Sequence, residues 1–210
     1  MGLIKFTIKK VVRINMSSAK RIQFEGLVYD PNKPRTVVDP LKWLTSEQIK
    51  VEIETKKQNF SILLVNVDYD LNTGTIIRTA NVFGAREVIL YGRKKFDRRA
   101  SVGAEFYTNF RQIEYLNQLE DTLSEFDNII ALENNLANTQ SLVDYKWDYN
   151  QKTLICLGQE GNGIPEEILN LCKVTLEIPQ LGSVRSLNVS TAAAIVMYDY
   201  LAKSLKQSSF

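Results

Sequence analysis

The sequence contains no histidine and only two cysteines among its 210 residues. Without histidine the chain lacks the commonest general base and the commonest ligand of transition metals. Cys156 and Cys172 both stand in apolar surroundings, which predicts reduced core residues and not a disulfide framework. No run of about 18 apolar residues occurs, so we expect no membrane span. The composition, 44% hydrophobic and 24% charged, is typical of a globular protein with one main core.

Residues 1–58 differ in charge from the rest of the chain. They carry 12 Lys and Arg against 6 Asp and Glu, whereas residues 59–210 carry 14 against 18. A basic segment on a mildly acidic body favours an anionic partner, although simple solvation of the surface is the alternative. We therefore divide the chain into a basic N-terminal extension, 1–58, and a main domain, 59–210.

The first 24 residues hold six basic residues and no acid, a composition shared with mitochondrial transit peptides. Apolar and basic residues alternate over 6–13, however, and this alternation is typical of an exposed strand. We therefore expect a cytoplasmic protein, with mitochondrial targeting as the alternative.

From residue 60 onward, short apolar runs alternate with helical patterns. Strands are expected at 60–67, 87–92, 110–116, 128–133, 153–158 and 173–179. Helices are expected at 45–58, 72–84, 117–126, 165–172 and 188–205. This alternation predicts an α/β fold with a mostly parallel sheet flanked by helices.

The last expected helix contains AAAIVMY, residues 192–198, which is apolar on every face. Such a helix must be covered on all sides, and a sheet covers only one of them. The sequence therefore predicts a homodimer in which a second subunit covers the other side.

The stretch VDYDLNTGTIIRTANVFGA carries acids and an amide with the spacing of a calcium loop. Counted from its first Asp, however, the sixth residue is Thr73 and the twelfth is Thr79, so the Gly and the bidentate Glu of such a loop are missing. We expect instead that Asn72 caps a helix. Arg78 is expected within this helix near an apolar face, where a guanidinium needs an anionic partner; an ion pair inside the fold is the alternative.

Two further segments follow later strands, at the sheet edge where open α/β folds bind ligands. LICLGQEGNGIPEEI holds a glycine turn in the order G-x-x-G-x-G, which is not the Rossmann order, and Glu160 in its middle disfavours a phosphate site. LEIPQLGSVRSLNVSTAAAI ends a strand at Pro179 and opens a helix near Asn188, with backbone N–H groups free for a ligand. Taken singly, the first is equally explained as a tight turn between a strand and a helix, and an ordinary loop with a capped helix is the alternative for the second.

Together the three segments resemble the SpoU (TrmH-like) branch of the SPOUT RNA methyltransferases. The first motif matches at Asn72, Gly74, Arg78, Ala80, Phe83 and Gly84. The second matches at Gly158, Glu160 and Gly163. The third matches at Ile178, Pro179, Gly182, Ser186, Leu187, Asn188, Val189, Ser190 and Ala192. The resemblance covers about residues 60–205 and leaves out 1–58, and Gln180 replaces a commonly apolar residue.

The resemblance implies transfer of a methyl group from S-adenosylmethionine to a ribose 2′-hydroxyl of tRNA or rRNA, without a metal. It also implies a C-terminal trefoil knot. The implied catalytic residues are Arg78, Asn72, Glu160, Ser186 and Asn188. The implied cofactor-binding residues are Leu157, Gly158, Gly163, Ile178, Pro179, Gly182, Leu187 and Asn188. Gly158 is expected where the backbone approaches the ligand.

An arginine is a poor base because its pKa exceeds about 12. We therefore expect Arg78 to bind phosphate and to stabilise the forming alkoxide.

The basic cluster GRKKFDRR follows the second expected strand. It predicts RNA-phosphate contacts from Arg93, Lys94, Lys95, Arg98 and Arg99, with a solvated loop as the alternative. Residues 1–58 are expected to contact RNA as well. A non-catalytic RNA-binding protein on the same fold is the main alternative function, and loss of Arg78 or Asn188 would have favoured it. An unrelated nucleotide-binding enzyme is disfavoured by Glu160 and by the basic extension.

Overall fold

The computed structural model describes residues 36–92, 96–134 and 136–207. Several predictions fall outside these residues: the strand at 6–13, the transit-peptide alternative, and the RNA contacts of Arg93, Lys94 and Lys95. Among the described residues, no helix is both long and apolar enough to cross a membrane.

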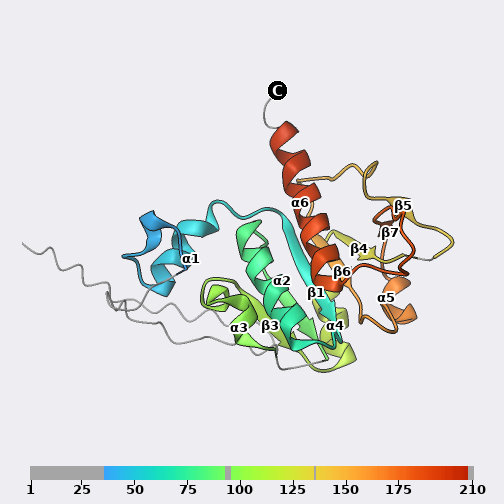
Figure 1. Cartoon of the computed structure of the whole chain (residues 1–210), viewed down its shortest axis with the longest axis horizontal. Helices are drawn as coiled ribbons and strands as arrows, with labels where there is room; N and C mark the ends of the chain where they lie inside the picture. The colour runs from blue at the N-terminus through green and yellow to red at the C-terminus, as the bar shows by residue number, and fades with distance from the viewer. Residues whose placement is uncertain (1–35, 93–95, 135, 208–210) are drawn as a thin grey trace, which may run out of the picture.

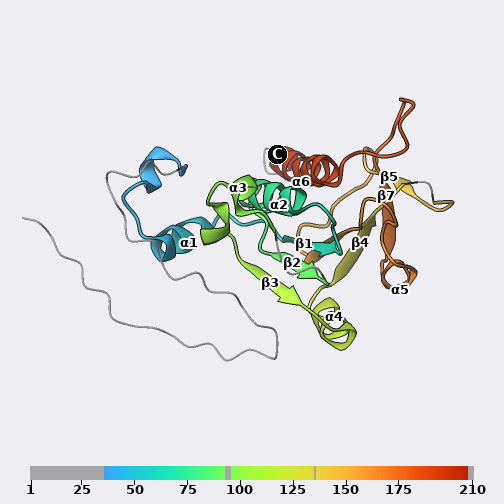
Figure 2. The same ribbon diagram turned by 60° about the horizontal axis from the view of Figure 1, so that its bottom comes forward.

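A single parallel sheet forms the centre of the described structure (Figures 1 and 2). Its order is β3-β2-β1-β6-β4-β7-β5, and every neighbouring pair is parallel. The strands are β1 Phe60–Val65, β2 Val88–Tyr91, β3 Phe110–Ile113, β4 Asn128–Leu132, β5 Gln140–Ser141, β6 Thr153–Leu157 and β7 Val174–Glu177. The predicted α/β class is confirmed. Only β5 was not predicted, since two residues show no periodicity. The trefoil knot stays a prediction.

Most of the described helices lie close to where the sequence predicts them. The helices are α1 Ser46–Glu54, α2 Asp70–Val82, α3 Arg98–Ser101, α4 Leu116–Leu123, α5 Glu166–Leu169 and α6 Val189–Gln207, with short 3-10 helices η1 Asp39–Leu41 and η2 Ala104–Phe106. Helix α1 begins where it is expected, and the structure shows a capping box between Thr45 and Gln48 at its start. The short elements η1, α3 and η2 were not predicted, because a single turn has too few residues for a periodic pattern.

The two faces of the sheet are covered by different helices (Figure 2). Helices α2 and α6 cover one face, where Ile76, Ile77, Val196 and Met197 are fully buried with Ile62 of β1. Helices α4 and α5 cover the other face through Leu119, Leu123 and Ile168. Because helices cover both faces, the central strands are apolar on both sides, as is usual for a parallel sheet. Burial of this apolar surface stabilises the fold by roughly 25 cal/mol per Å².

The start of α2 corrects one prediction. The residue before the helix is Tyr69, and Asn72 lies inside the first turn, with its N–H donating to the Tyr69 carbonyl at 2.8 Å. Asn72 is therefore not the cap, and its side chain is available for the contacts described below. The helix ends before Gly84, whose φ of 73° is left-handed, as the sequence predicts.

Both cysteines are free thiols, as predicted: Cys156 is buried on β6 and Cys172 is half-buried after α5. The hydrogen bond to Cys172, together with burial, holds the pKa of the Cys156 thiol well above its ordinary value. Cys156 is accordingly an inert core residue.

Candidate active site

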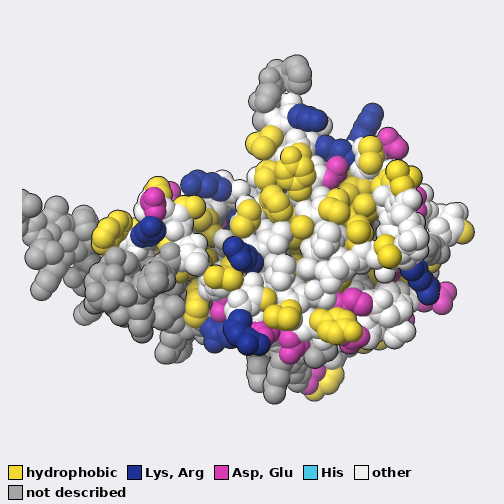
Figure 3. Space-filling model, in the orientation of Figure 1, with side chains coloured by type: hydrophobic (Ala, Val, Ile, Leu, Met, Phe, Trp, Pro, Cys, Tyr) yellow, Lys and Arg dark blue, Asp and Glu magenta, His cyan; other side chains and the backbone are white. Residues whose placement is uncertain are grey.

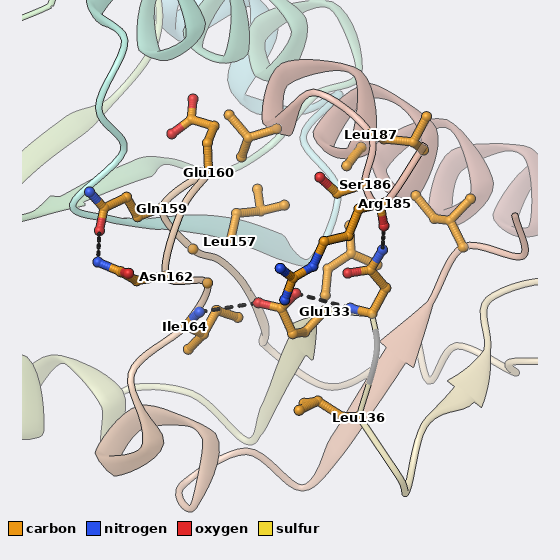
Figure 4. Close-up of a pocket in the computed structure, with 18 of the residues that line it drawn as sticks. Glu133, Leu136, Leu157, Gln159, Glu160, Asn162, Ile164, Arg185, Ser186 and Leu187 are labelled. Carbon is orange, nitrogen blue, oxygen red and sulfur yellow. Dashed lines mark hydrogen bonds between the residues drawn. The ribbon is translucent and has the colours of Figure 1, made fainter. Parts of the chain in front are cut away.

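A cavity of about 310 Å³ opens at the carboxyl ends of β4 and β6 (Figure 4). Its walls come from residues 132–134, 157–164 and 178–187 and from the beginning of α6. Leu132, Leu157 and Ile164 line it with apolar surface and are themselves buried. The place and the volume are those of a small-molecule site in a parallel α/β fold.

The glycine turn between β6 and α5 closes on itself. Gln159 and Gly163 exchange two backbone hydrogen bonds, of 3.2 and 2.8 Å. Gly163 has a left-handed φ of 69°. A Cβ on Gly158 would lie 2.2 Å from the carbonyl carbon of Gly163. Gly158 is therefore needed for the approach of the chain to itself, and the approach of a ligand to its backbone stays a prediction.

Glu160, in the middle of this turn, reaches across to the beginning of α2. Its Oε1 accepts a hydrogen bond from Asn72 Nδ2, and its Oε2 accepts one from the backbone N–H of Asp68 at 3.2 Å. Asn72 Oδ1 accepts in turn from Asn188 Nδ2 at 3.1 Å. A single amide, only 9% exposed, thus joins the second motif to the third. Its oxygen and its nitrogen both have partners, which fixes its orientation.

Asn188 also holds the beginning of α6. Its Oδ1 accepts hydrogen bonds from the N–H of Ser190 at 2.9 Å and from the Ser190 hydroxyl at 2.6 Å. A longer contact of 3.4 Å comes from the N–H of Thr191. This is the contact pattern of an N-cap. The position of Asn72 is therefore tied to the first turn of the longest helix.

The lining of the cavity defines what kind of ligand suits it. Apolar walls suit a flat aromatic base, and the backbone of the turn supplies hydrogen-bonding groups at the same place. Two carboxylates, Glu133 and Glu160, line the cavity and favour a ligand with hydroxyl donors or positive charge. Arg185 is the only basic side chain among the described residues of the lining. An adenosine joined to a sulfonium has these features.

The sequence profile of the SpoU rRNA Methylase family matches residues 59–198, two thirds of the chain. The chain belongs to this family. The match spans all three motifs whose side chains meet around Asn72, and the resemblance inferred from those motifs is confirmed.

Two curated SpoU relatives illustrate the similarity. The mouse tRNA (guanosine(18)-2′-O)-methyltransferase TARBP1 is 31% identical over 146 residues, which cover 66% of this chain and 9% of that protein. The tRNA (guanosine(18)-2′-O)-methyltransferase of Escherichia coli K12 is 29% identical over 147 residues, 69% of this chain and 63% of that protein. The chain thus spans less than two thirds of the length of either relative.

A solved structure shows the same fold. The AdoMet-bound rRNA methyltransferase of Sinorhizobium meliloti aligns with a TM-score of 0.62 at 25% identity. The alignment covers 70% of this chain and 56% of that one. The chain therefore shares the fold of that methyltransferase over most of its length.

The cavity brings together most of the predicted cofactor-binding residues. Leu157, Gly158, Gly163, Ile178 and Leu187 line it. Pro179, Gly182 and Asn188 do not line it. Gly182 is exposed, and a Cβ there would meet nothing among the described atoms within 4 Å, so no close approach explains this glycine.

The predicted catalytic residues divide into two groups. Glu160 and Ser186 line the cavity, and Asn72 and Asn188 are bonded to Glu160 directly or through one another. Arg78 belongs to neither group, because it does not line this cavity and has no hydrogen bond to these residues.

Arg78 departs from the expectation of a guanidinium near an apolar face with an anionic partner. Its side chain is exposed and lies at a second cavity, of about 510 Å³, which Lys56, Lys57 and Tyr107 also line. Within the described part of the chain, its guanidinium has neither a hydrogen bond nor an ion pair. Six residues at 3.6 per turn place Arg78 and Asn72 on different faces of α2. Arg78 therefore faces away from the first cavity and lines the second.

The structure also separates the two described residues of the basic cluster. Arg98 Nε donates to Glu105 Oε1 at 3.0 Å, and Glu105 is 3% exposed and also accepts from the Ser101 hydroxyl. The side chain of Arg99 is 89% exposed and pairs with Asp97. The Arg98 guanidinium thus stabilises the fold by pairing with a buried carboxylate, whereas the Arg99 side chain faces solvent.

Glu133, Asn134 and Arg185 line the cavity but were not predicted as site residues. Glu133 and Asn134 directly follow β4, and β4 pairs with β6 in register. A polar pair at the carboxyl end of a strand was the available signal. The sequence, however, does not tell which strand lies beside β6.

Proposed function

We propose that this SpoU-family protein transfers a methyl group from S-adenosylmethionine to a ribose 2′-hydroxyl of tRNA or rRNA. The observation that carries the proposal is the hydrogen-bonded group of Glu160, Asn72 and Asn188 at the rim of the cavity. It joins one residue from each family motif. The E. coli and mouse relatives, both named as tRNA 2′-O-methyltransferases, support this reaction.

The first cavity is the proposed cofactor site. When bound, S-adenosylmethionine supplies a methyl group activated by a neighbouring sulfonium. Leu157, Ile164 and Leu187 offer apolar walls for its adenine, and the Glu160 carboxylate favours positive charge nearby. The relative from S. meliloti, solved with AdoMet bound, supports the assignment.

Arg78 is proposed to stabilise the ribose oxygen as it loses its proton and to bind the adjacent phosphate. A guanidinium suits this role because it stays charged and offers two parallel donors. Since Arg78 faces away from the cavity of its own subunit, we propose that a second copy of the chain completes the site.

The homodimer is proposed to form through α6 and the neighbouring face of α2. Figure 3 shows hydrophobic side chains gathered along α6 on the side presented in this view. Tyr198 is 61% exposed, Val82 69% and Ile195 36%, and the Tyr198 ring lies 6.0 Å from that of Phe83. An exposed apolar face of this kind is typical of an interface.

RNA is proposed to bind through phosphate contacts that include Arg99 and residues of the basic extension 1–58. Neutralising such contacts should flatten the salt dependence of RNA binding, because fewer counterions are released. Arg98 is expected to act mainly on stability, since its loss leaves Glu105 buried without its ion pair.

The function is tested by mapping ribose methylation in RNA from cells with and without the protein. The proposal expects at least one 2′-O-methyl mark that disappears with the protein and returns with the wild-type chain, but not with Arg78→Ala. An unchanged methylation map together with specific RNA binding would identify a non-catalytic RNA-binding protein instead.

A further inference from the structure

Glu133 places a carboxylate at the wall of the first cavity, directly after β4. Its Oε1 accepts a hydrogen bond from the N–H of Asn134 at 3.0 Å, and its Oε2 accepts one from the N–H of Ile164 at 3.1 Å (Figure 4). The carboxylate therefore connects the end of β4 to the glycine turn. Two backbone donors fix its orientation before any ligand arrives.

Gly163 explains how the carboxylate comes so close to the turn. A Cβ on Gly163 would lie 2.5 Å from Glu133 Oε2, and the residue also has a left-handed φ of 69°. Any side chain here would push the carboxylate away and strain the backbone. Gly163 of the second motif is thus matched to Glu133, a residue outside the three motifs.

The carboxylate keeps acceptor capacity for a ligand. An ionised carboxylate offers about four lone-pair sites, and the two backbone N–H groups occupy two of them. Glu133 is half-buried and lines the cavity beside Leu132 and Leu157. Its place differs from that of Glu160, which is bonded to Asn72 and the Asp68 N–H. A fixed acceptor beside apolar walls suits hydroxyl donors on a molecule that also carries a flat base.

We propose that Glu133 binds the ribose hydroxyls of the adenosine moiety in this cavity and so selects ribonucleosides over deoxyribonucleosides. The inference rests on the proposed cofactor site and names a specificity residue within it. The contact is a charge-assisted hydrogen bond, which is stronger than a neutral one.

The test is a binding cycle with S-adenosylhomocysteine and its 2′-deoxy and 3′-deoxy forms, measured by titration calorimetry on the full chain. In the wild type, removal of a contacted hydroxyl should weaken binding roughly 10- to 100-fold, the usual effect of losing a hydrogen bond to a charged group. Glu133→Gln should weaken binding of the parent ligand by a similar factor. In that variant, removal of the same hydroxyl should cost less than about threefold, because the partner is already lost.

Glu177→Gln is the matched control. Glu177 ends the neighbouring strand β7 and accepts a hydrogen bond from Thr139 at 2.6 Å, but it does not line the cavity. This variant should keep the affinities of the wild type for all three ligands. Thermal unfolding without ligand should confirm that both variants are folded.

Three results would overturn the inference. An equal penalty for the deoxy ligands in the wild type and in Glu133→Gln would show that Glu133 only holds the turn, and the proposed function would stand. Equal wild-type affinity for all three ligands would show that no hydroxyl is contacted. No wild-type binding of S-adenosylhomocysteine would remove the proposed cofactor site along with the role of Glu133.

Discussion

Asn188 donates a 3.1 Å hydrogen bond to the side-chain oxygen of Asn72, a residue 116 positions earlier in the chain. Asn72 uses its other end to bind Glu160, 88 positions later. The two contacts connect the N-terminal turns of α2 and α6 to the glycine turn after β6. Three segments that are distant in sequence are thereby held at one rim of the cavity.

Truncation of this amide should separate positioning from general stability. Asn72→Ala removes both hydrogen bonds and leaves the Glu160 carboxylate without its side-chain donor, which should cost about 1–3 kcal/mol of unfolding free energy. Methyl transfer should fall roughly 10- to 100-fold, because small displacements of reacting groups are costly. The measurements are urea unfolding and single-turnover transfer.

Thr73→Ala is the control for this variant. Thr73 is the next residue in the same turn and is 5% exposed. Its truncation should lower stability through lost packing and leave single-turnover transfer near the wild-type rate. Equal loss of transfer in both variants would mean that the turn as a whole matters and not the amide.

Arg78→Ala should nearly abolish methyl transfer, on the order of 100- to 1000-fold, and leave cofactor affinity close to that of the wild type. The structure gives the reason for the second part, since Arg78 lines a different cavity. Arg78→Lys should restore little, because an ammonium cannot make the two-pronged contact. Tritiated-methyl transfer to bulk RNA and cofactor titration check the two parts. Retained transfer with collapsed cofactor binding would assign Arg78 to the cofactor pocket or to the fold.

The exposed face of α6 should hold two subunits together. Light scattering at micromolar concentration should give about twice 24.0 kDa for the wild type and about 24.0 kDa for Tyr198→Asp. Val51→Asp introduces the same charge at an apolar residue of α1 that is 74% exposed, and it should leave the dimer intact. A monomeric wild type would contradict the dimer, and with it the proposal that Arg78 acts on a neighbouring subunit.

Tyr200 should make the fold sensitive to high pH. Burial raises the pKa of its phenol to about 12, from an ordinary value of 10.0, in a cluster with Phe60, Trp147 and Tyr149. The unfolded chain loses this proton at a lower pH than the folded protein does. The contribution of Tyr200 to the free energy of unfolding is therefore complete below pH 10 and is lost as pH rises toward 12. The free energy of unfolding should fall by an amount on the order of 2 kcal/mol over this range.

Urea unfolding between pH 9 and pH 12 checks this prediction. The free energy of unfolding should fall less steeply with pH in Tyr200→Phe than in the wild type. Tyr69→Phe is the control, because it removes a hydroxyl from a side chain that is 66% exposed. Its free energy of unfolding should fall with pH as in the wild type. The same slope in Tyr200→Phe and wild type would contradict the assignment.

The sequence predicted the α/β class because strands and helices as long as β1, β6 and α6 carry clear periodicity. Through the family resemblance it also named candidate site residues in the segments of all three motifs, and seven of these line the first cavity: Leu157, Gly158, Glu160, Gly163, Ile178, Ser186 and Leu187. Their roles toward a ligand stay predictions. It did not predict Glu133, since only the pairing of β4 with β6 brings this residue to the glycine turn. The exposure of Arg78 was missed for a related reason. Apolar neighbours along a helix do not tell which of its faces the sheet covers.

The reaction itself is most directly tested with S-adenosylmethionine carrying a deuterated methyl group. Bulk tRNA and rRNA would be incubated with the wild type or with Arg78→Ala, digested to nucleosides and analysed by mass spectrometry. The account predicts a deuterated methyl group on the ribose of a 2′-O-methyl nucleoside with the wild type and almost none with Arg78→Ala. Label on a base, or no label in RNA that the protein demonstrably binds, would contradict it.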